Sequence, residues 1–156
     1  MRKIRIIAVG KDKDAWVEEG VAHYLKLLGR YATVEIEIVP KSRLPLSAPP
    51  DTIMQDEAQS IQKKIGDSKY FALHDRGESF TSEKFAKFME NATAGQRGAL
   101  TFVIGGAYGL DKKLLSKAQA CLSLSPLTFN HQIVRLILLE QLYRAFTISE
   151  GTDYHK

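Results

Sequence analysis

Hydrophobic positions along the chain follow two periods in alternation. Between residues 33 and 39, Val34, Ile36 and Ile38 alternate with glutamates, which predicts a half-buried strand. Between residues 17 and 28, apolar side chains recur every three or four positions, as they do on one face of a helix. Strand-like and helix-like segments continue to alternate to the end of the chain. This alternation predicts an α/β fold with a mainly parallel sheet and helices on both faces.

The remaining elements follow from the same periods and from residues that start or stop helices. Further strands are expected at residues 3–9, 69–74, 99–104 and 121–125. The stretch from Pro40 to Pro50 is rich in proline and predicts a loop, and Asp75 to Gly77 predicts a turn. Helices are expected to begin at side chains that can cap an N-terminus, namely Asp12 or Asp14, Asp51, Thr81 or Ser82, and Asp111.

The last predicted helix, about residues 132–146, is apolar all around its axis instead of along one stripe. A helix of this kind is buried on most sides. Two arrangements explain the pattern: a subunit interface, or a central position within one protomer. The pattern alone leaves both open.

Two loops at strand ends carry most of the functional information. Gly105 to Gly109 follows the strand at 99–104, and Ser123 to Thr128 precedes the last helix. Loops at the ends of parallel strands hold nucleotide-like ligands in α/β proteins, and glycine allows the backbone to approach a ligand closely. The spacing does not match the dinucleotide or P-loop motifs, so no nicotinamide or ATP site is predicted. A tight structural turn is the alternative reading of the glycines.

Composition narrows the classes of protein further. With 156 residues, of which 44% are hydrophobic and 26% charged, the chain is expected to form one globular domain, residues 1–156. The net charge of +4 weakly favours a polyanionic partner. The single cysteine, Cys121, excludes an internal disulfide, and the four scattered histidines show no metal-binding spacing. No signal peptide or membrane span is predicted, and a reducing cytoplasm fits best.

The chain ends in Tyr154, His155 and Lys156. Stacking, hydrogen bonding and positive charge together suit a splayed-out RNA base, although a frayed end is the plain alternative. Other basic residues would extend this tail into a phosphate-binding surface: Arg2, Lys3, Arg5, Lys11, Lys13, Lys112, Lys113 and Lys117.

Seven segments in order resemble the RlmH family, small SPOUT-class methyltransferases, over essentially the whole chain. They are residues 6–11, 71–77, 102–110, 122–132, Arg135, 140–145 and 154–156. The resemblance implies methyl transfer from S-adenosylmethionine to N3 of a pseudouridine in 23S ribosomal RNA of assembled ribosomes. It also implies a homodimer and a C-terminal trefoil knot, which no periodicity would suggest. A sulfonium methyl group is already activated, so no metal is required.

The resemblance also assigns roles to residues of this chain. It implies a cofactor site formed by Leu73, Gly105, Leu124, Ser125, Pro126, Leu127, Thr128 and Phe129. It implies roles in RNA binding and catalysis for Glu140, Arg144, Tyr154, His155 and Lys156.

Two positions depart from the family pattern. Asn130 stands where the family usually has proline, so the loop before the last helix is expected to be less rigid. Lys156 stands where many members have arginine, and lysine cannot make forked contacts.

Two other functions stay open at this point: a non-enzymatic ribosome-binding or RNA-binding factor, and a SPOUT methyltransferase that acts on transfer RNA. The cofactor-type loops favour an enzyme, and the sequence assigns no general base.

Overall fold

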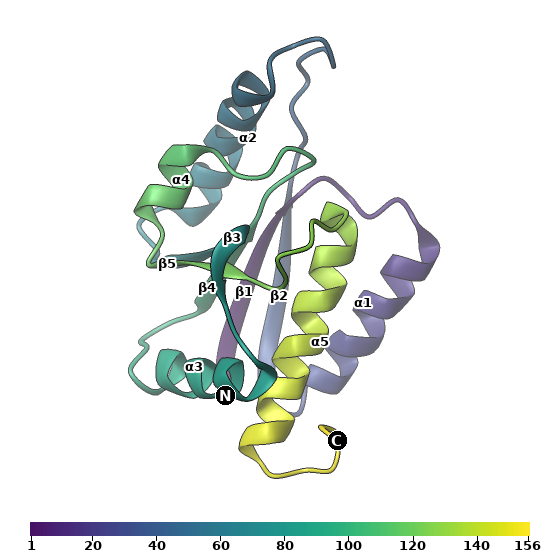
Figure 1. Cartoon of the computed structure of the whole chain (residues 1–156), viewed down its shortest axis with the longest axis vertical. Coiled ribbons are helices and arrows are strands. Elements are labelled where there is room, and N and C mark those ends of the chain that lie inside the picture. Colours follow the sequence, from purple (N-terminus) through teal and green to yellow (C-terminus); the bar gives the residue numbers. More distant parts are fainter.

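Five strands form one parallel sheet in the order β2-β1-β4-β3-β5 (Figure 1). The computed structural model describes residues 1–156. The predicted parallel sheet is therefore confirmed, and the predicted strand bounds differ from the observed ones by a few residues at most, except in β3. The strands are β1 (Arg2–Val9), β2 (Ala32–Val39), β3 (Tyr70–Ser79), β4 (Leu100–Ile104) and β5 (Ala120–Ser123).

Helices cover both faces of the sheet, as the alternating pattern predicts (Figure 1). The larger apolar core lies between the sheet and α1, α3 and α5, and the smaller one lies between the sheet and α2 and α4. Alternate residues of β1 enter the two cores, because successive side chains of a strand point to opposite faces. The helices are α1 (Ala15–Leu28), α2 (Pro50–Ile65), α3 (Ser82–Ala94), α4 (Lys112–Lys117) and α5 (His131–Ser149).

The last helix, α5, takes the central position on its face of the sheet, between α1 and α3. Leu138, Leu139 and Leu142 are completely buried within the single chain. This accounts for much of the all-round apolar pattern without a second subunit. Ile133 and Ile137 are only half-buried and belong to neither apolar core.

The turn predicted at residues 75–77 is wrong, because β3 continues to Ser79. Leu122 of β5 pairs with both Leu73 and Glu78, so residues 74–77 bulge out of the ladder. Gly77 lies in this bulge, where a Cβ atom would stand 2.6 Å from the carbonyl oxygen of Cys121. The glycine that reads as a turn signal instead permits the close approach of two backbones.

The predicted helix starts are correct at Thr81 and Asp111, whose side chains accept hydrogen bonds from backbone amides of the first turn. They are wrong at Asp51, because α2 begins at Pro50 and its N-cap position is Pro49, two residues before Asp51. Proline is favoured in the first turn, where its missing N–H is not needed. Asp14 occupies the N-cap position of α1 but makes no side-chain cap bond.

Candidate functional site

A cavity opens beside the ends of β4 and β5, next to the N-terminus of α5. It has a volume of about 210 Å³. Its walls are the bulge of β3, the glycine loop after β4, the loop after β5 and the first turn of α5. Seven of the eight residues predicted for the cofactor line it, namely Leu73, Gly105, Leu124, Ser125, Leu127, Thr128 and Phe129. Pro126 is not among the lining residues.

The glycine loop closes tightly on itself. The backbone N–H of Gly109 donates to the carbonyl oxygen of Gly106 at 3.0 Å, and Gly109 has a φ of +85°. A Cβ atom on Gly105 would stand only 2.4 Å from the carbonyl carbon of Gly109. Backbone groups therefore form this wall of the cavity, and position 105 has no room for a side chain.

The loop after β5 is held against the β3 bulge by hydroxyl groups. The Oγ of Ser123 lies 3.0 Å from the carbonyl oxygen of Asp75 and 2.9 Å from that of Ser125. The Oγ1 of Thr128 donates to the Asp75 carboxylate at 3.2 Å. Leu127 stands at the mouth of the cavity with 70% of its surface exposed. The loop is thus fixed at its base and presents an apolar side chain to solvent.

Asn130 caps the helix that follows this loop. Its side-chain oxygen accepts a hydrogen bond from the backbone N–H of Gln132 at 2.9 Å. A proline at this position could not make that bond. The cap therefore compensates for part of the rigidity that the loop loses by having no proline ring here.

Arg135 ties the start of α5 to the end of β1. Its side chain is 1% exposed, and its Nη1 lies 2.6 Å from the Asp12 carboxylate. Its Nη2 donates to the carbonyl oxygens of Val9 and Gly10. In the sequence Arg135 is one of the positions that carry the resemblance but has no visible partner, whereas in the fold it is a paired, buried charge that positions one edge of the site.

Replacing Arg135 by methionine is expected to lower the free energy of unfolding by about 3–5 kcal/mol, because the Asp12 carboxylate and two buried carbonyls lose their donor. Chemical denaturation measures the change. Arg97→Met is the matched control, since Arg97 is exposed and forms no ion pair. A loss below about 1 kcal/mol for Arg135→Met, the range of a surface pair, would show that the buried charge is dispensable.

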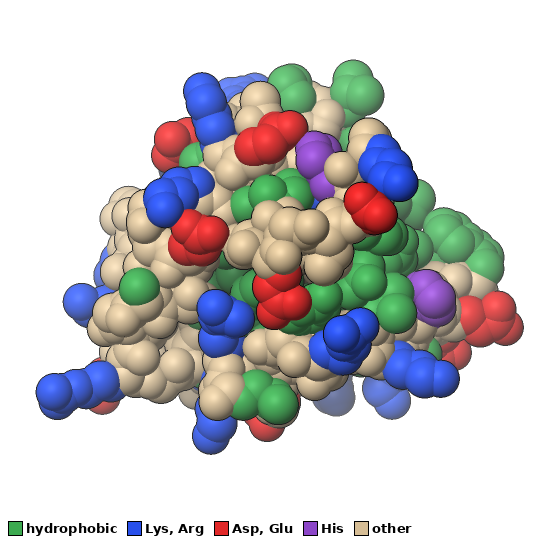
Figure 2. Space-filling model, turned by 90° about the horizontal axis from the view of Figure 1, so that it is seen from below, with side chains coloured by type: hydrophobic (Ala, Val, Ile, Leu, Met, Phe, Trp, Pro, Cys, Tyr) green, Lys and Arg blue, Asp and Glu red, His purple; other side chains and the backbone are tan.

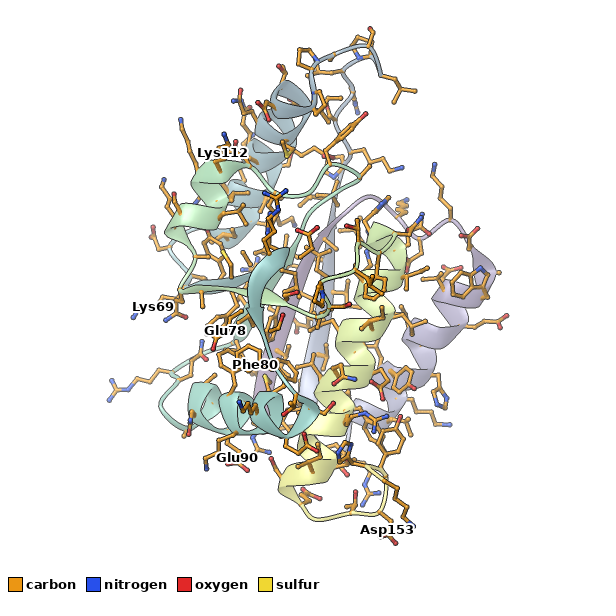
Figure 3. All side chains as sticks on the ribbon, viewed as in Figure 1. Lys69, Glu78, Phe80, Glu90, Lys112 and Asp153 are labelled. Carbon is orange, nitrogen blue, oxygen red and sulfur yellow. The ribbon has the colours of Figure 1, made fainter.

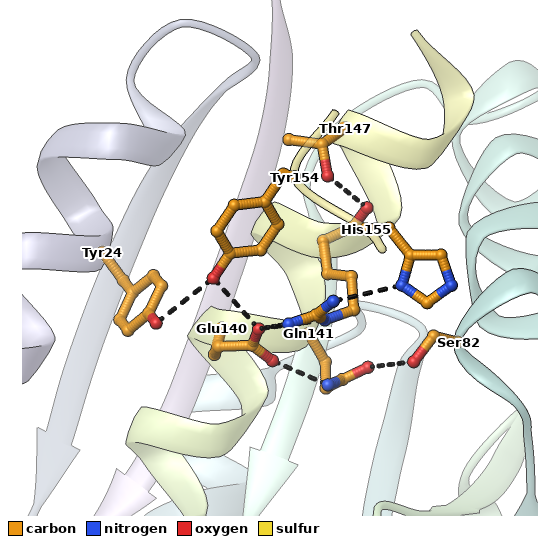
Figure 4. Close-up of polar contacts among 8 residues, drawn as sticks. Tyr24, Ser82, Glu140, Gln141, Thr147, Tyr154 and His155 are labelled. Atoms are coloured by element: carbon orange, nitrogen blue, oxygen red, sulfur yellow. Dashed lines mark hydrogen bonds and ion pairs between the residues drawn. The ribbon is translucent and has the colours of Figure 1, made fainter. Parts of the chain in front are cut away.

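The residues predicted for RNA binding and catalysis meet near the other end of α5 (Figure 4). The Oε1 of Glu140 accepts hydrogen bonds from Nη2 of Arg144 at 2.7 Å and from the hydroxyl of Tyr154 at 3.2 Å. The Arg144 guanidinium lies 4.8 Å from the centre of the Tyr154 ring. Burial is the main cause that raises the pKa of Tyr154, followed by its bond with Tyr24, so the phenol stays protonated.

His155 extends this cluster to α3. Arg144 donates to its Nδ1 at 3.1 Å, so Nε2 carries the proton and donates to Glu83 at 2.9 Å. This bond is the main cause that lowers the pKa of Glu83 to about 2. Lys156 does not contact this cluster. Its side chain is 74% exposed, and its Nζ lies 3.9 Å from the Asp153 carboxylate. Four of the five predicted residues are therefore together.

The cavity and the tail cluster lie at different points along α5. At 1.5 Å per residue, Glu140 and Arg144 stand about 14 and 20 Å along the axis from His131 at the cavity. Figure 3 shows Asp153 of the tail at the opposite end of the molecule from Lys112, which follows the glycine loop. One chain therefore does not join the two sets of predicted residues into one site.

The basic residues singled out from the sequence are divided between the two ends of the parallel sheet, because Arg2 and Lys3 begin β1 whereas Lys11 and Lys13 follow its end. In Figure 2, lysines and arginines are spread over the lower end of the molecule, among acidic and apolar side chains. Arg5 is paired with Glu37 on β2 and is not available to a phosphate.

No three His, Cys, Asp or Glu side chains are placed to hold a metal ion. None of the helices has the length and apolar character needed to cross a membrane.

Comparison with solved structures shows the same architecture in methyltransferases. The chain superposes on a probable methyltransferase from Bordetella pertussis Tohama I with a TM-score of 0.58 and 15% identity, covering 92% of this chain and 96% of that one. A putative methyltransferase from Legionella pneumophila, in complex with the bound cofactor SAM, gives a TM-score of 0.50 at 12% identity, covering 93% and 66%. At these identities the likeness concerns the fold alone.

Sequence comparison reaches further. Two relatives named "Ribosomal RNA large subunit methyltransferase H" align over nearly their whole length. One, from Streptococcus thermophilus, is 41% identical over 158 residues, with 99% of each chain covered. The other, from Limosilactobacillus reuteri, is 44% identical over 157 residues, with 98% of this chain and 99% of that one covered. The family model described as "Predicted SPOUT methyltransferase" matches residues 2–155. These matches confirm the resemblance seen in the motifs, and the chain belongs to the SPOUT methyltransferase family.

Proposed function

We propose that this protein transfers the methyl group of S-adenosylmethionine to N3 of a pseudouridine in large-subunit ribosomal RNA, on assembled ribosomes in the cytoplasm. The full-length match to relatives with that ribosomal RNA methyltransferase name supports the class of substrate. The cavity closed by Gly105 to Gly109 is the observation that carries the proposal, because a pure RNA-binding module needs no such pocket.

The cavity has the character that an adenosine-containing cofactor requires. Leu73, Ile104, Leu124 and Phe129 supply apolar walls, and the glycine loop supplies backbone groups close to the ligand space. A few polar groups among apolar walls are typical of small-molecule sites. The proposed cofactor residues are the seven that line the cavity, with Pro126 acting only through the shape of its loop.

S-Adenosylmethionine supplies an activated methyl group on a sulfonium. The chain itself must align the base with that group and exclude water from it. The imide N3 becomes a good nucleophile once its proton has left. Positive groups beside the base favour the anion, and Arg144 and Lys156 are the candidates for this role. Glu140 would hold the Arg144 guanidinium in place through their bond of 2.7 Å.

We propose a homodimer in which the tail of one subunit completes the cavity of the other. The separation of the two clusters along α5 supports this arrangement. Apolar side chains on the loop after β5 and in the N-terminal halves of α1 and α5 are available to a second copy: Leu127 is 70% exposed, Trp16 is 56% exposed, and Ile133 and Ile137 are half-buried. The trefoil knot that the family implies also stays a prediction.

The proposal is tested by incubating the protein with labelled S-adenosylmethionine and ribosomes that lack the modification. Label is expected in large-subunit ribosomal RNA, at N3 of a pseudouridine. Label in transfer RNA instead would support the alternative substrate. Binding to ribosomes without any transfer of label would support the non-enzymatic factor. Sedimentation of the protein as a monomer at micromolar concentration would contradict the dimer.

A further inference from the structure

A group of basic side chains gathers at the end of β1, beside the cavity. The side chain of Lys41 lies across Gly10, where a Cβ atom would stand 2.7 Å from its Cε. The backbone N–H of Lys13 donates to the side chain of Gln132 at 3.1 Å, which fixes the loop that carries Lys13 against α5. We call Lys13, Lys41, His131 and Arg135 the β1 corner.

The two lysines of the β1 corner have no acidic partner of their own. The ammonium group of Lys13 is the main cause that lowers the pKa of Lys41. Neither lysine forms an ion pair, whereas the nearby Asp12 carboxylate is taken by Arg135. Glu57, which favours the charge of Lys41 only weakly, is 5% exposed and turned toward the amide of Ser42. Two adjacent like charges cost free energy unless an anion lies between or beside them.

His131 connects the β1 corner with the cavity. It lines the cavity, and its Nε2 is buried without a hydrogen-bond partner. Burial is the main cause that lowers its pKa, and the positive charges of Arg135, Lys41 and Lys13 lower it further, while Asp12 acts in the opposite direction. The imidazole is therefore uncharged at neutral pH, and its pKa responds to the positive charge of the β1 corner.

We propose that the β1 corner binds a phosphate group of the substrate RNA, next to the base that enters the site. This inference rests on the proposed function. Lys13 and Lys41 are exposed and reachable by an RNA backbone, and both lie outside the cavity wall that would hold the cofactor. A phosphodiester would relieve the repulsion between the two ammonium groups. The carboxylate of the cofactor has similar chemistry, so the experiment separates the two sources.

The double variant Lys13→Ala/Lys41→Ala is compared with Lys26→Ala/Lys63→Ala, which removes the same charge from exposed lysines of α1 and α2. Binding to ribosomes that lack the modification is measured by cosedimentation over a range of salt concentrations. The first variant is expected to bind about tenfold more weakly, with a slope of log K against log salt reduced by about 1–2. The control variant should keep most of the wild-type affinity and slope. Equal behaviour of the two variants would overturn the proposal.

Calorimetry separates the phosphate from the cofactor's carboxylate. S-Adenosylhomocysteine carries the carboxylate, and 5′-methylthioadenosine lacks it. The corner variant is expected to bind both as the wild type does. Weaker binding of S-adenosylhomocysteine alone would assign the corner to the cofactor and overturn the assignment to RNA. Ribosome binding does not depend on methyl transfer, so a wild type that binds through the corner without methylating would contradict only the proposed function.

The pKa of His131, followed by NMR, gives a readout that needs no RNA. Inorganic phosphate is expected to raise it in the wild type, because a bound anion offsets the charges of Lys13, Lys41 and Arg135. In the corner variant the pKa is expected to start higher, because two cations are gone, and to respond less to phosphate. A His131 pKa that phosphate leaves unchanged in the wild type would count against the site.

Discussion

Gly105→Ala is expected to abolish cofactor binding, with a loss of affinity of at least about 100-fold. The added Cβ would stand 2.4 Å from the carbonyl carbon and 2.6 Å from the carbonyl oxygen of Gly109, so the backbone of the loop must move. Such overpacking costs about 1–3 kcal/mol of stability, and the displaced loop forms a wall of the cavity. Calorimetry with S-adenosylhomocysteine measures the affinity, and thermal denaturation shows whether the variant is folded.

Gly95→Ala is the matched control. Gly95 follows α3, and no atom lies within 4 Å of the Cβ that the substitution adds. It is expected to bind the cofactor as the wild type does. Wild-type affinity in Gly105→Ala would show that the glycine loop is only a structural turn, which is the alternative reading of its sequence.

Deleting Tyr154 to Lys156 is expected to abolish methyl transfer while cofactor binding and folding persist. The tail lies at the surface, and its ion pair and hydrogen bonds contribute about 1 kcal/mol or less each. The Tyr154 ring also packs on Tyr143, with 4.7 Å between ring centroids, and on Arg144, and such contacts contribute about 0.5–1.5 kcal/mol each. Glu140 and Arg144 keep their own bond without it. The activity is measured on ribosomes that lack the modification, and Asp153→Ala serves as the control. Full activity of the truncated protein would remove the tail from the mechanism.

Mixing the two inactive proteins tests whether subunits share a site. In a heterodimer of the truncated chain with Gly105→Ala, one composite site keeps an intact cavity and an intact tail, so part of the activity is expected to return. Phe129→Glu blocks the cavity wall as a second choice if Gly105→Ala does not fold. No recovery, despite proven exchange of subunits, would mean that each subunit builds its own site.

Local periodicity was sufficient to predict the sheet and its helices, because alternation such as Val34, Ile36 and Ile38 reports burial within one element. It failed at Gly77, where the relevant contact is with the backbone of Cys121 on another strand. It was ambiguous for α5, since a central helix and an interface helix have the same pattern. Contacts between distant segments do not produce a periodic pattern in the sequence of either segment.

The candidate site was also predicted only in part, for the same physical reason. The motifs correctly gathered the residues around the cavity, because the loops they mark follow neighbouring strands. They did not separate the cavity from the tail cluster, since the length of α5 between them is not visible in a list of motifs. Lys41 and His131 were missed as partners, because they are single residues far apart in the sequence that meet only at the end of β1.

The central position of α5 also sets the order in which the nascent chain can fold. The larger apolar core needs Leu138, Leu139 and Leu142, which are synthesised after all five strands and the other four helices. Until then α1 and α3 have no helix between them to cover their apolar faces. The N-terminal half of the chain therefore cannot complete its core until α5 has been synthesised, and the native packing follows that step.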